Sequence, residues 1–220
     1  MNDVSPAATA PNELYRSLSA DLYRLALRGV VRRYPKNKVV ITEGALSDSL
    51  YVLLAGSVKV YSLDESGREI VYGDIFAGDF FGEMSLDGGP RSASVMTLEA
   101  CTCAVLTRAE LREHLAQEPD FTFTLVNRVV ARARAATCTA RNIALLDVYG
   151  RIVALLESRH GPAREGASVA VRPITHQDIA NRVGSSREMV SRLLKEMEKA
   201  GYIALGVKRI DLLKKLPQRW

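Results

Sequence analysis

The chain has 220 residues, with 30 basic and 25 acidic side chains and a formal net charge of +5. It is long enough for one large or two modest domains, each able to bury a core. No stretch is long and apolar enough to span a membrane, and three cysteines without an export signal favour free thiols in a reducing cytoplasm over a disulfide framework.

The first residues are rich in Ala, Pro, Asn and Ser, and they lack both a cationic start and an apolar run. They predict a disordered tail over residues 1–13 and argue against a signal peptide. The first folded domain is expected over residues 14–118.

Short β-type runs separated by glycines dominate residues 39–106. The expected strands are residues 39–41, 50–54, 57–61, 69–72 and 103–106. Glycines fall between them at turn spacing, which predicts a small antiparallel barrel or jelly roll and argues against a βαβ domain.

Within this domain, residues 80–95 combine side chains suited to a nucleotide. Gly82 permits close approach of the backbone, Glu83 can accept hydrogen bonds from sugar hydroxyls, and Arg91 can pair with a phosphate. A short helical turn after Gly82 and the Ser92 hydroxyl would add donors. The alternative is a salt bridge between Glu83 and Arg91 across a loop, which the spacing alone does not reject.

A long helix is predicted over residues 119–146. Its apolar stripe repeats at alternating spacings of three and four residues and consists of Val126, Val129, Ala133, Ala136, Ala140 and Ile143. Such a stripe pairs with the same helix of a second copy or packs on its own barrel, and the pattern does not distinguish the two.

Residues 174–199 predict two helices joined by a turn. In the first, Ile179, Ala180 and Val183 have helical spacing, while Thr175 can cap its start and Gly184 can end it. Ser186 offers a second N-cap before an apolar stripe of Met189, Val190, Leu193, Leu194 and Met197. This arrangement is typical of a helix-turn-helix, whose second helix enters the major groove of DNA.

Three charged residues of the second helix lie off its apolar stripe: Arg187, Glu188 and Arg192. An arginine matches the O6 and N7 acceptors of guanine, and a glutamate can accept from the amino group of cytosine. The alternative is a solvated face on which Glu188 and Arg192 pair with each other. Two β-type runs around Gly206, at 200–204 and 209–213, predict a wing and favour DNA binding.

The positive charge lies entirely in the C-terminal third. Residues 146–220 carry 14 basic and 8 acidic side chains, a net charge of +6, whereas residues 1–145 carry 16 and 17, a net charge of −1. Neutralising DNA phosphates requires such an excess, although modest positive surfaces also occur without nucleic acid. The split favours a separate domain over residues 147–220.

Both motifs resemble the CRP/FNR (catabolite activator) family of bacterial transcription regulators. Residues 80–95 are similar to the phosphate-binding cassette of cyclic-nucleotide-binding domains, and residues 185–192 to the family's recognition helix. The resemblance covers roughly residues 14–213. It implies an α+β chain with an antiparallel jelly roll, a long dimerisation helix, a hinge at 147–150 and a winged helix-turn-helix.

The resemblance also implies a dimeric regulator that binds double-stranded DNA under the control of a cyclic nucleotide in the barrel. The residues expected at the ligand are Gly82, Glu83, Met84, Arg91, Ser92, Arg132 and Thr137. Glu83 would bind the ribose 2′-hydroxyl, and Arg91 with Ser92 the cyclic phosphate. The residues expected at a TGTGA-type half-site are Thr175, Ser186, Arg187, Glu188, Arg192 and Lys208. RNA polymerase is an expected partner at the loop 159–167.

Two departures from the family pattern concern the effector. Glu83 and Arg91 are eight positions apart, which is fewer than usual, and Ala136 stands where cyclic AMP sensors carry a threonine. Only Thr137 keeps a hydroxyl there. Cyclic AMP remains the first expectation, with cyclic di-GMP or activity without any ligand as alternatives. An interaction subunit that binds a ligand but does not read DNA is a further alternative of another class.

Other chemistries have little support in the sequence. No cysteine precedes Cys101, so the N-terminal cluster of an iron–sulfur sensor is missing. His114, His160 and His176 are scattered and are expected at the surface, which argues against a haem sensor. No nucleophile–base set and no metal-spaced cluster occurs, so neither catalysis nor a metal site is expected.

Overall fold

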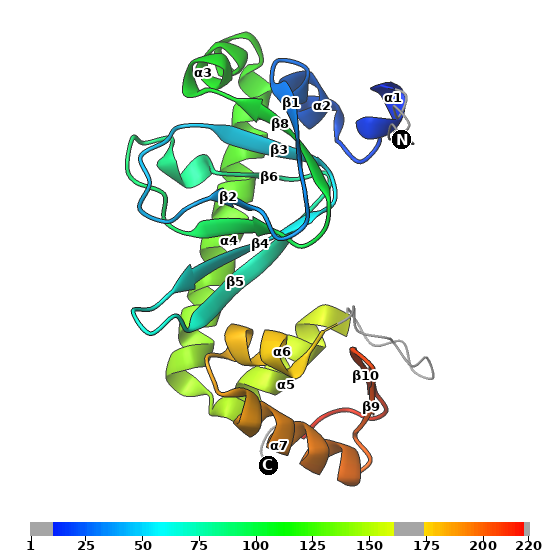
Figure 1. Cartoon of the computed structure of the whole chain (residues 1–220). Helices are drawn as coiled ribbons and strands as arrows, with labels where there is room; N and C mark the ends of the chain where they lie inside the picture. Colours follow the sequence, from blue (N-terminus) through cyan, green and yellow to red (C-terminus); the bar gives the residue numbers. More distant parts are fainter. Residues whose placement is uncertain (1–10, 161–173, 218–220) are drawn as a thin grey trace, which may run out of the picture. The chain divides into compact units, whose positions relative to one another are not determined.

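The structure is a computed structural model that describes residues 11–160 and 174–217. The chain divides into two compact units, whose elements Figure 1 labels: residues 1–62 with 72–130, and residues 63–71 with 131–220. Residues 1–10 of the predicted tail lie outside the described residues. The remainder of that tail differs from expectation, because Pro11–Leu14 form the short helix α1.

Two four-stranded antiparallel sheets form the framework around the predicted cassette. One has the strand order β1-β8-β3-β6 and contains β1 (Val30–Tyr34), β3 (Leu50–Ala55), β6 (Phe80–Phe81) and β8 (Cys101–Leu106). The other has the order β2-β7-β4-β5 and contains β2 (Val39–Ile41), β4 (Ser57–Leu63), β5 (Glu69–Phe76) and β7 (Ser94–Thr97). All predicted strands are present, and β1, β6 and β7 are additional.

Strand β3 contributes to two cores because its side chains alternate between the faces of its sheet. Leu53 joins one core with Ile41, Val58, Phe81, Val95, Cys101 and Cys103. Its neighbours Val52 and Leu54 join the other core, which is completed mainly by helical side chains, among them Leu22, Leu25, Leu111 and Phe121. Burial on both faces explains why this strand is a continuous apolar run in the sequence.

Helices cover the second of these cores. The helix α2 (Ala20–Ala26) begins at Ser19, whose side chain accepts a hydrogen bond from the Leu22 backbone N–H. The helix α3 (Arg108–Gln117) begins with a capping box between Thr107 and Glu110. The helix α4 (Pro119–Leu145) follows directly and has 27 residues, close to the predicted range of 119–146.

The prediction that His114 lies at the surface is wrong. His114 is 2% exposed, and its ring packs edge-to-face on Phe121 at a centroid distance of 5.0 Å. Position 114 lies one helical turn after the core residue Leu111, so it shares the buried face of α3. Burial lowers the pKa of His114, and nearby Arg28 adds to that effect.

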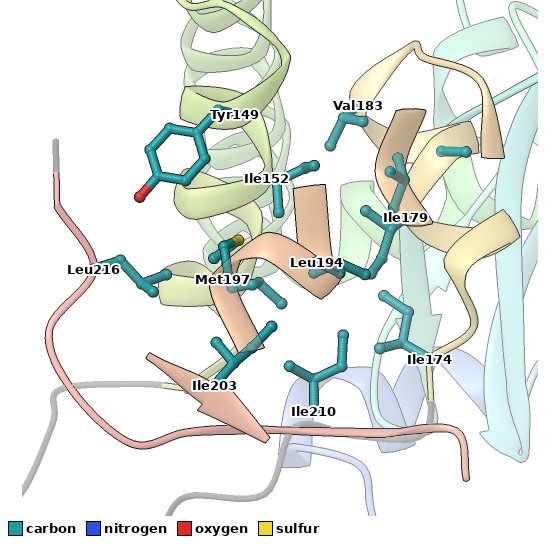
Figure 2. Close-up of a cluster of buried hydrophobic side chains, with 13 residues drawn as sticks. Tyr149, Ile152, Ile174, Ile179, Val183, Leu194, Met197, Ile203, Ile210 and Leu216 are labelled. Carbon is teal, nitrogen blue, oxygen red and sulfur yellow. The ribbon is translucent and has the colours of Figure 1, made fainter. Parts of the chain in front are cut away.

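In the described part of the second unit, three helices and a hairpin that follow α4 surround one hydrophobic core. They are α5 (Val148–His160), α6 (His176–Val183), α7 (Arg187–Lys199), β9 (Ile203–Gly206) and β10 (Arg209–Leu212). Figure 2 shows side chains from all five elements meeting in this core, including Ile152, Ile179, Leu194, Ile203 and Ile210. The helix pair and the hairpin are the predicted helix-turn-helix and wing, and the α+β class is confirmed.

Candidate functional site

The cassette begins at Gly82, in a conformation that only glycine adopts easily. Gly82 has φ of 89° and stands directly before the 3₁₀ turn η1 (Glu83–Ser85). A Cβ at this position would lie 2.8 Å from the Ser49 carbonyl oxygen and 2.8 Å from Arg91 Nη1. The absence of a side chain therefore lets the cassette backbone approach the neighbouring loop and Arg91.

The guanidinium of Arg91 joins three segments of the chain. Nε donates to Ser47 Oγ at 2.8 Å, Nη1 to the Gly82 carbonyl at 2.7 Å, and Nη2 to the Ser49 carbonyl at 2.7 Å. Arg91 is 3% exposed, and its burial lowers its pKa. Because a guanidinium has five N–H groups, these bonds use three of them. The structure thus shows that Arg91 braces the cassette, while its contact with a phosphate stays a prediction.

The other cassette residues differ in exposure. Glu83 is buried, while Met84 is exposed and its sulfur accepts a hydrogen bond from Ser92 Oγ at 3.3 Å. The loop of residues 87–89, which is shortened by the close spacing of Glu83 and Arg91, closes on itself because Asp87 Oδ1 accepts from the Gly89 N–H at 2.8 Å. Beside it lies a hollow of about 270 Å³, lined by Leu46, Ser47, Asp48, Ser85, Gly88 and Gly89. The structure therefore brings five of the seven predicted ligand residues into one cassette.

The remaining two predicted ligand residues lie on α4, in the part that belongs to the second unit. Arg132 is half-buried. Thr137 is exposed, and its hydroxyl donates to the Ala133 carbonyl of its own helix at 3.0 Å. Such a bond to the preceding turn is common for helical threonines.

The start of each helix in the helix-turn-helix is fixed by a predicted cap. Thr175 accepts from the Asp178 N–H, and Asp178 accepts in return from the Thr175 N–H, which forms a capping box. Gly184 ends α6 in the left-handed conformation, and Ser186 caps α7 by accepting from the Met189 N–H at 3.2 Å. Two of the predicted DNA residues, Thr175 and Ser186, therefore define helix boundaries.

The predicted base-reading residues lie on the exposed face of α7. Val190, Leu194 and Met197 are buried, whereas Arg187, Glu188 and Arg192 are exposed. Within the described residues, Glu188 and Arg192 do not pair, and Arg192 Nη2 instead donates to Met189 Sδ at 3.0 Å. The three charged side chains thus lie outside the buried core of this unit.

The wing is tied to the helix-turn-helix through its turn. The turn consists of Val207 and Lys208, so Gly206 ends the first strand instead of lying between the two as predicted. Lys208 is exposed with φ of 54°, and its carbonyl accepts from the Ile174 N–H at 3.0 Å, directly before α6. This bond places the predicted wing contact beside the start of the first helix.

Two sets of partners were missed in the sequence. Ser47 and Ser49 bind Arg91 across more than forty positions, so only the fold brings them together. His176, the first residue of α6, lies with Nδ1 2.8 Å from Ser191 Oγ of α7. The contact between His176 and Ser191 could have been expected from the sequence. The two helices of a helix-turn-helix pack against each other, and position 176 begins one of them while position 191 lies in the other.

Neither a membrane span nor a metal cluster is found among the described residues. No helix in that part of the chain is both long and apolar enough to cross a bilayer. No group of three or more potential metal ligands gathers there. The three cysteines are free, with Cys101 and Cys103 buried and Cys138 exposed.

Comparisons with known proteins identify a domain family for each of the two parts of the chain. Residues 31–118 match the family model of the cyclic nucleotide-binding domain, and residues 150–216 that of the Crp-like helix-turn-helix domain. The "cAMP-activated global transcriptional regulator Vfr" of Pseudomonas aeruginosa is 35% identical over 78% of this chain and 84% of the relative. The "cAMP-activated global transcriptional regulator CRP" of Salmonella typhimurium is 33% identical over 82% and 88%.

Solved structures give the same result. The c-di-GMP responsive global regulator CLP of Xanthomonas campestris has a TM-score of 0.78 at 27% identity, covering 88% of this chain and 98% of that one. These relatives are transcription regulators and not enzymes. The two domain matches and these relatives show that this chain belongs to the CRP/FNR family of DNA-binding transcription regulators.

Proposed function

We propose that this chain is a homodimeric transcription regulator in which a cyclic nucleotide at the cassette controls recognition of a TGTGA-type half-site. The observation that carries the DNA-reading part is the exposed face of α7, where Arg187, Glu188 and Arg192 lie opposite the buried stripe. A fork-shaped arginine and a carboxylate on one face are suited to guanine and cytosine edges in the major groove. RNA polymerase is a further proposed partner, and the cytoplasm is the proposed location of the protein.

The proposed effector is cyclic AMP, bound at Glu83, Met84, Arg91 and Ser92 with Gly82 giving its backbone. Arg132 is the proposed partner of the ribose-binding glutamate, and Thr137 is the proposed hydroxyl for the base. Two relatives named as cAMP-activated support this choice. Cyclic di-GMP is the second candidate, supported by the likeness to the c-di-GMP responsive regulator and by the shortened loop that Asp87 closes.

Titration calorimetry with cyclic AMP, cyclic GMP and cyclic di-GMP tests the effector. Arg91→Ala would remove three structural hydrogen bonds together with the phosphate contact, so the sharper variant is Ser92→Ala. Ser92 is exposed, and its one hydrogen bond among the residues that the structure describes goes to Met84, so its loss leaves the Arg91 bonds in place. Tight binding of one nucleotide that weakens in Ser92→Ala supports the cassette. Binding of none of the three supports a regulator that needs no nucleotide.

Fluorescence anisotropy with a palindromic TGTGA operator and a scrambled duplex tests DNA recognition. Arg187→Ala is expected to cost about 1–3 kcal/mol of discrimination at one base pair. Lys199→Ala removes the same charge from the opposite end of α7 and serves as the matched control, with little effect on discrimination. A wild type that binds the operator and the scrambled duplex equally would favour the interaction subunit without DNA readout. Unchanged discrimination in Arg187→Ala would contradict the proposed base contact.

A further inference from the structure

The contact between His176 and Ser191 lies at the centre of the helix pair that is proposed to bind DNA. His176 Nδ1 is 2.8 Å from Ser191 Oγ, and the pair is partly buried. Ser191 belongs to α7 and lies between the exposed Arg187 and Lys195, four residues from each. Four residues is about one helical turn, so the imidazole faces a row that contains two cations.

Burial and those two cations both disfavour the charged form of His176 in the free protein. Partial burial lowers the pKa of His176, and the charges of Arg187 and Lys195 lower it further. No carboxylate is among the groups that shift it. A neutral imidazole has one donor and one acceptor nitrogen, whereas the imidazolium donates from both. Protonation would thus keep a bond to Ser191, with Nδ1 as the donor, and make Nε2 a donor as well.

Binding of DNA would reverse the local charge. In a helix-turn-helix the first helix crosses the phosphate backbone while the second enters the groove, so the start of α6 beside α7 approaches phosphates. We propose that His176 takes up a proton as the helix pair binds DNA, and that this makes DNA affinity rise as pH falls. The inference rests on the proposed function, since it requires that this helix pair binds DNA.

The direction of the pH effect follows from the two states. In the free protein the pKa of His176 is lowered from its ordinary value. In the proposed complex, DNA phosphates raise this pKa, because negative charge nearby favours the protonated imidazole. Affinity therefore increases as pH falls through the higher, DNA-bound pKa, and it becomes constant below the lower pKa of the free protein. Between the two values the slope approaches tenfold in affinity per pH unit for each helix-turn-helix, because each takes up about one proton.

Two substitutions bracket the titration. His176→Gln keeps a side chain able to bond Ser191 but removes the charge at every pH, and His176→Arg fixes a charge there. The measurement is calorimetry of operator binding at about pH 7.5 and pH 6.0 in two buffers of different ionisation enthalpy, which counts protons. Wild type is expected to take up protons and bind about three- to tenfold more tightly at the lower pH. Both variants are expected to lose the uptake.

Salt dependence provides a second readout. The imidazolium would neutralise one more phosphate, so the slope of log affinity against log salt should steepen by about 0.9 per site in wild type at low pH. His176→Gln should show no such change. Specific DNA binding with the same proton uptake in wild type and His176→Gln would overturn this inference alone. Failure of the wild type to bind any DNA would overturn the proposed function, and this inference with it.

Discussion

Gly82 combines a left-handed backbone with a close approach, and the two effects can be separated by substitution. Gly82→Ala would place a methyl group 2.8 Å from the Ser49 carbonyl oxygen in a backbone at φ of 89°. We expect it to lower the free energy of unfolding by about 3 kcal/mol or more, since the backbone strain alone costs about 1–3 kcal/mol. Urea denaturation of the purified protein measures this loss.

Gly44→Ala is the matched control at the residue scale. Gly44 has φ of 78°, but a Cβ there would meet no atom within 4 Å. It should therefore cost only the backbone strain, about 1–2 kcal/mol. Equal losses in the two variants would mean that the approach to Ser49 and Arg91 adds nothing to the cost at position 82.

The α7 cap allows stability and DNA binding to be separated at the scale of an element. Ser186→Ala removes the acceptor for the Met189 N–H and should cost about 1 kcal/mol of stability. Ser186→Asp restores a cap of equal quality but places a negative charge where DNA phosphates are proposed to lie. We expect wild-type thermal stability and weaker operator binding for Ser186→Asp. Undiminished operator binding by this variant would place the start of α7 away from the DNA backbone.

The exposed stripe of α4 gives a second prediction for an element. Val126 is 49% and Val129 42% exposed, in the part of the helix that belongs to the first unit. Val129→Glu is expected to convert the proposed dimer into a monomer, because the charge would be buried at the pairing face. Asn127→Glu is the control, since at 100° per residue it lies almost opposite Val129. Sedimentation velocity at several concentrations distinguishes the two. A dimer that persists in Val129→Glu would contradict the proposed pairing face.

Sequence patterns predicted the elements whose signals are local. The apolar runs at β2 and β3, the caps Thr175 and Ser186, and the stop at Gly184 all depend on neighbouring residues. Strand β1 was missed because most of its side chains are exposed, so no apolar alternation marks it. Strand β6 was missed because it has two residues, too few to show any period.

Long-range partners account for the rest of what the sequence left out. The expectations for Arg91 were an external anion or a salt bridge with Glu83, and neither included the Ser49 carbonyl, which carries no mark in the sequence. The surface expectation for His114 ignored its position one turn after the core residue Leu111. Burial of a polar residue depends on what the fold places opposite it, and here that is Phe121.

For the whole molecule, the proposed control of DNA binding by a nucleotide makes a reciprocal prediction. If the nucleotide tightens operator binding by a given factor, saturating operator must tighten nucleotide binding by the same factor, because both measure one coupling free energy. Typical couplings change the affinity for the other ligand by roughly 5- to 150-fold.

The proposed hinge at 147–150 falls at the start of α5, where Asp147 Oδ1 accepts from the Gly150 N–H at 2.7 Å. Calorimetry of the nucleotide with and without operator, compared with anisotropy of the operator with and without nucleotide, measures both factors. Nucleotide affinity that is unchanged by operator would refute allosteric control while leaving DNA recognition intact, since at least one of the two ligands would then bind both conformations equally.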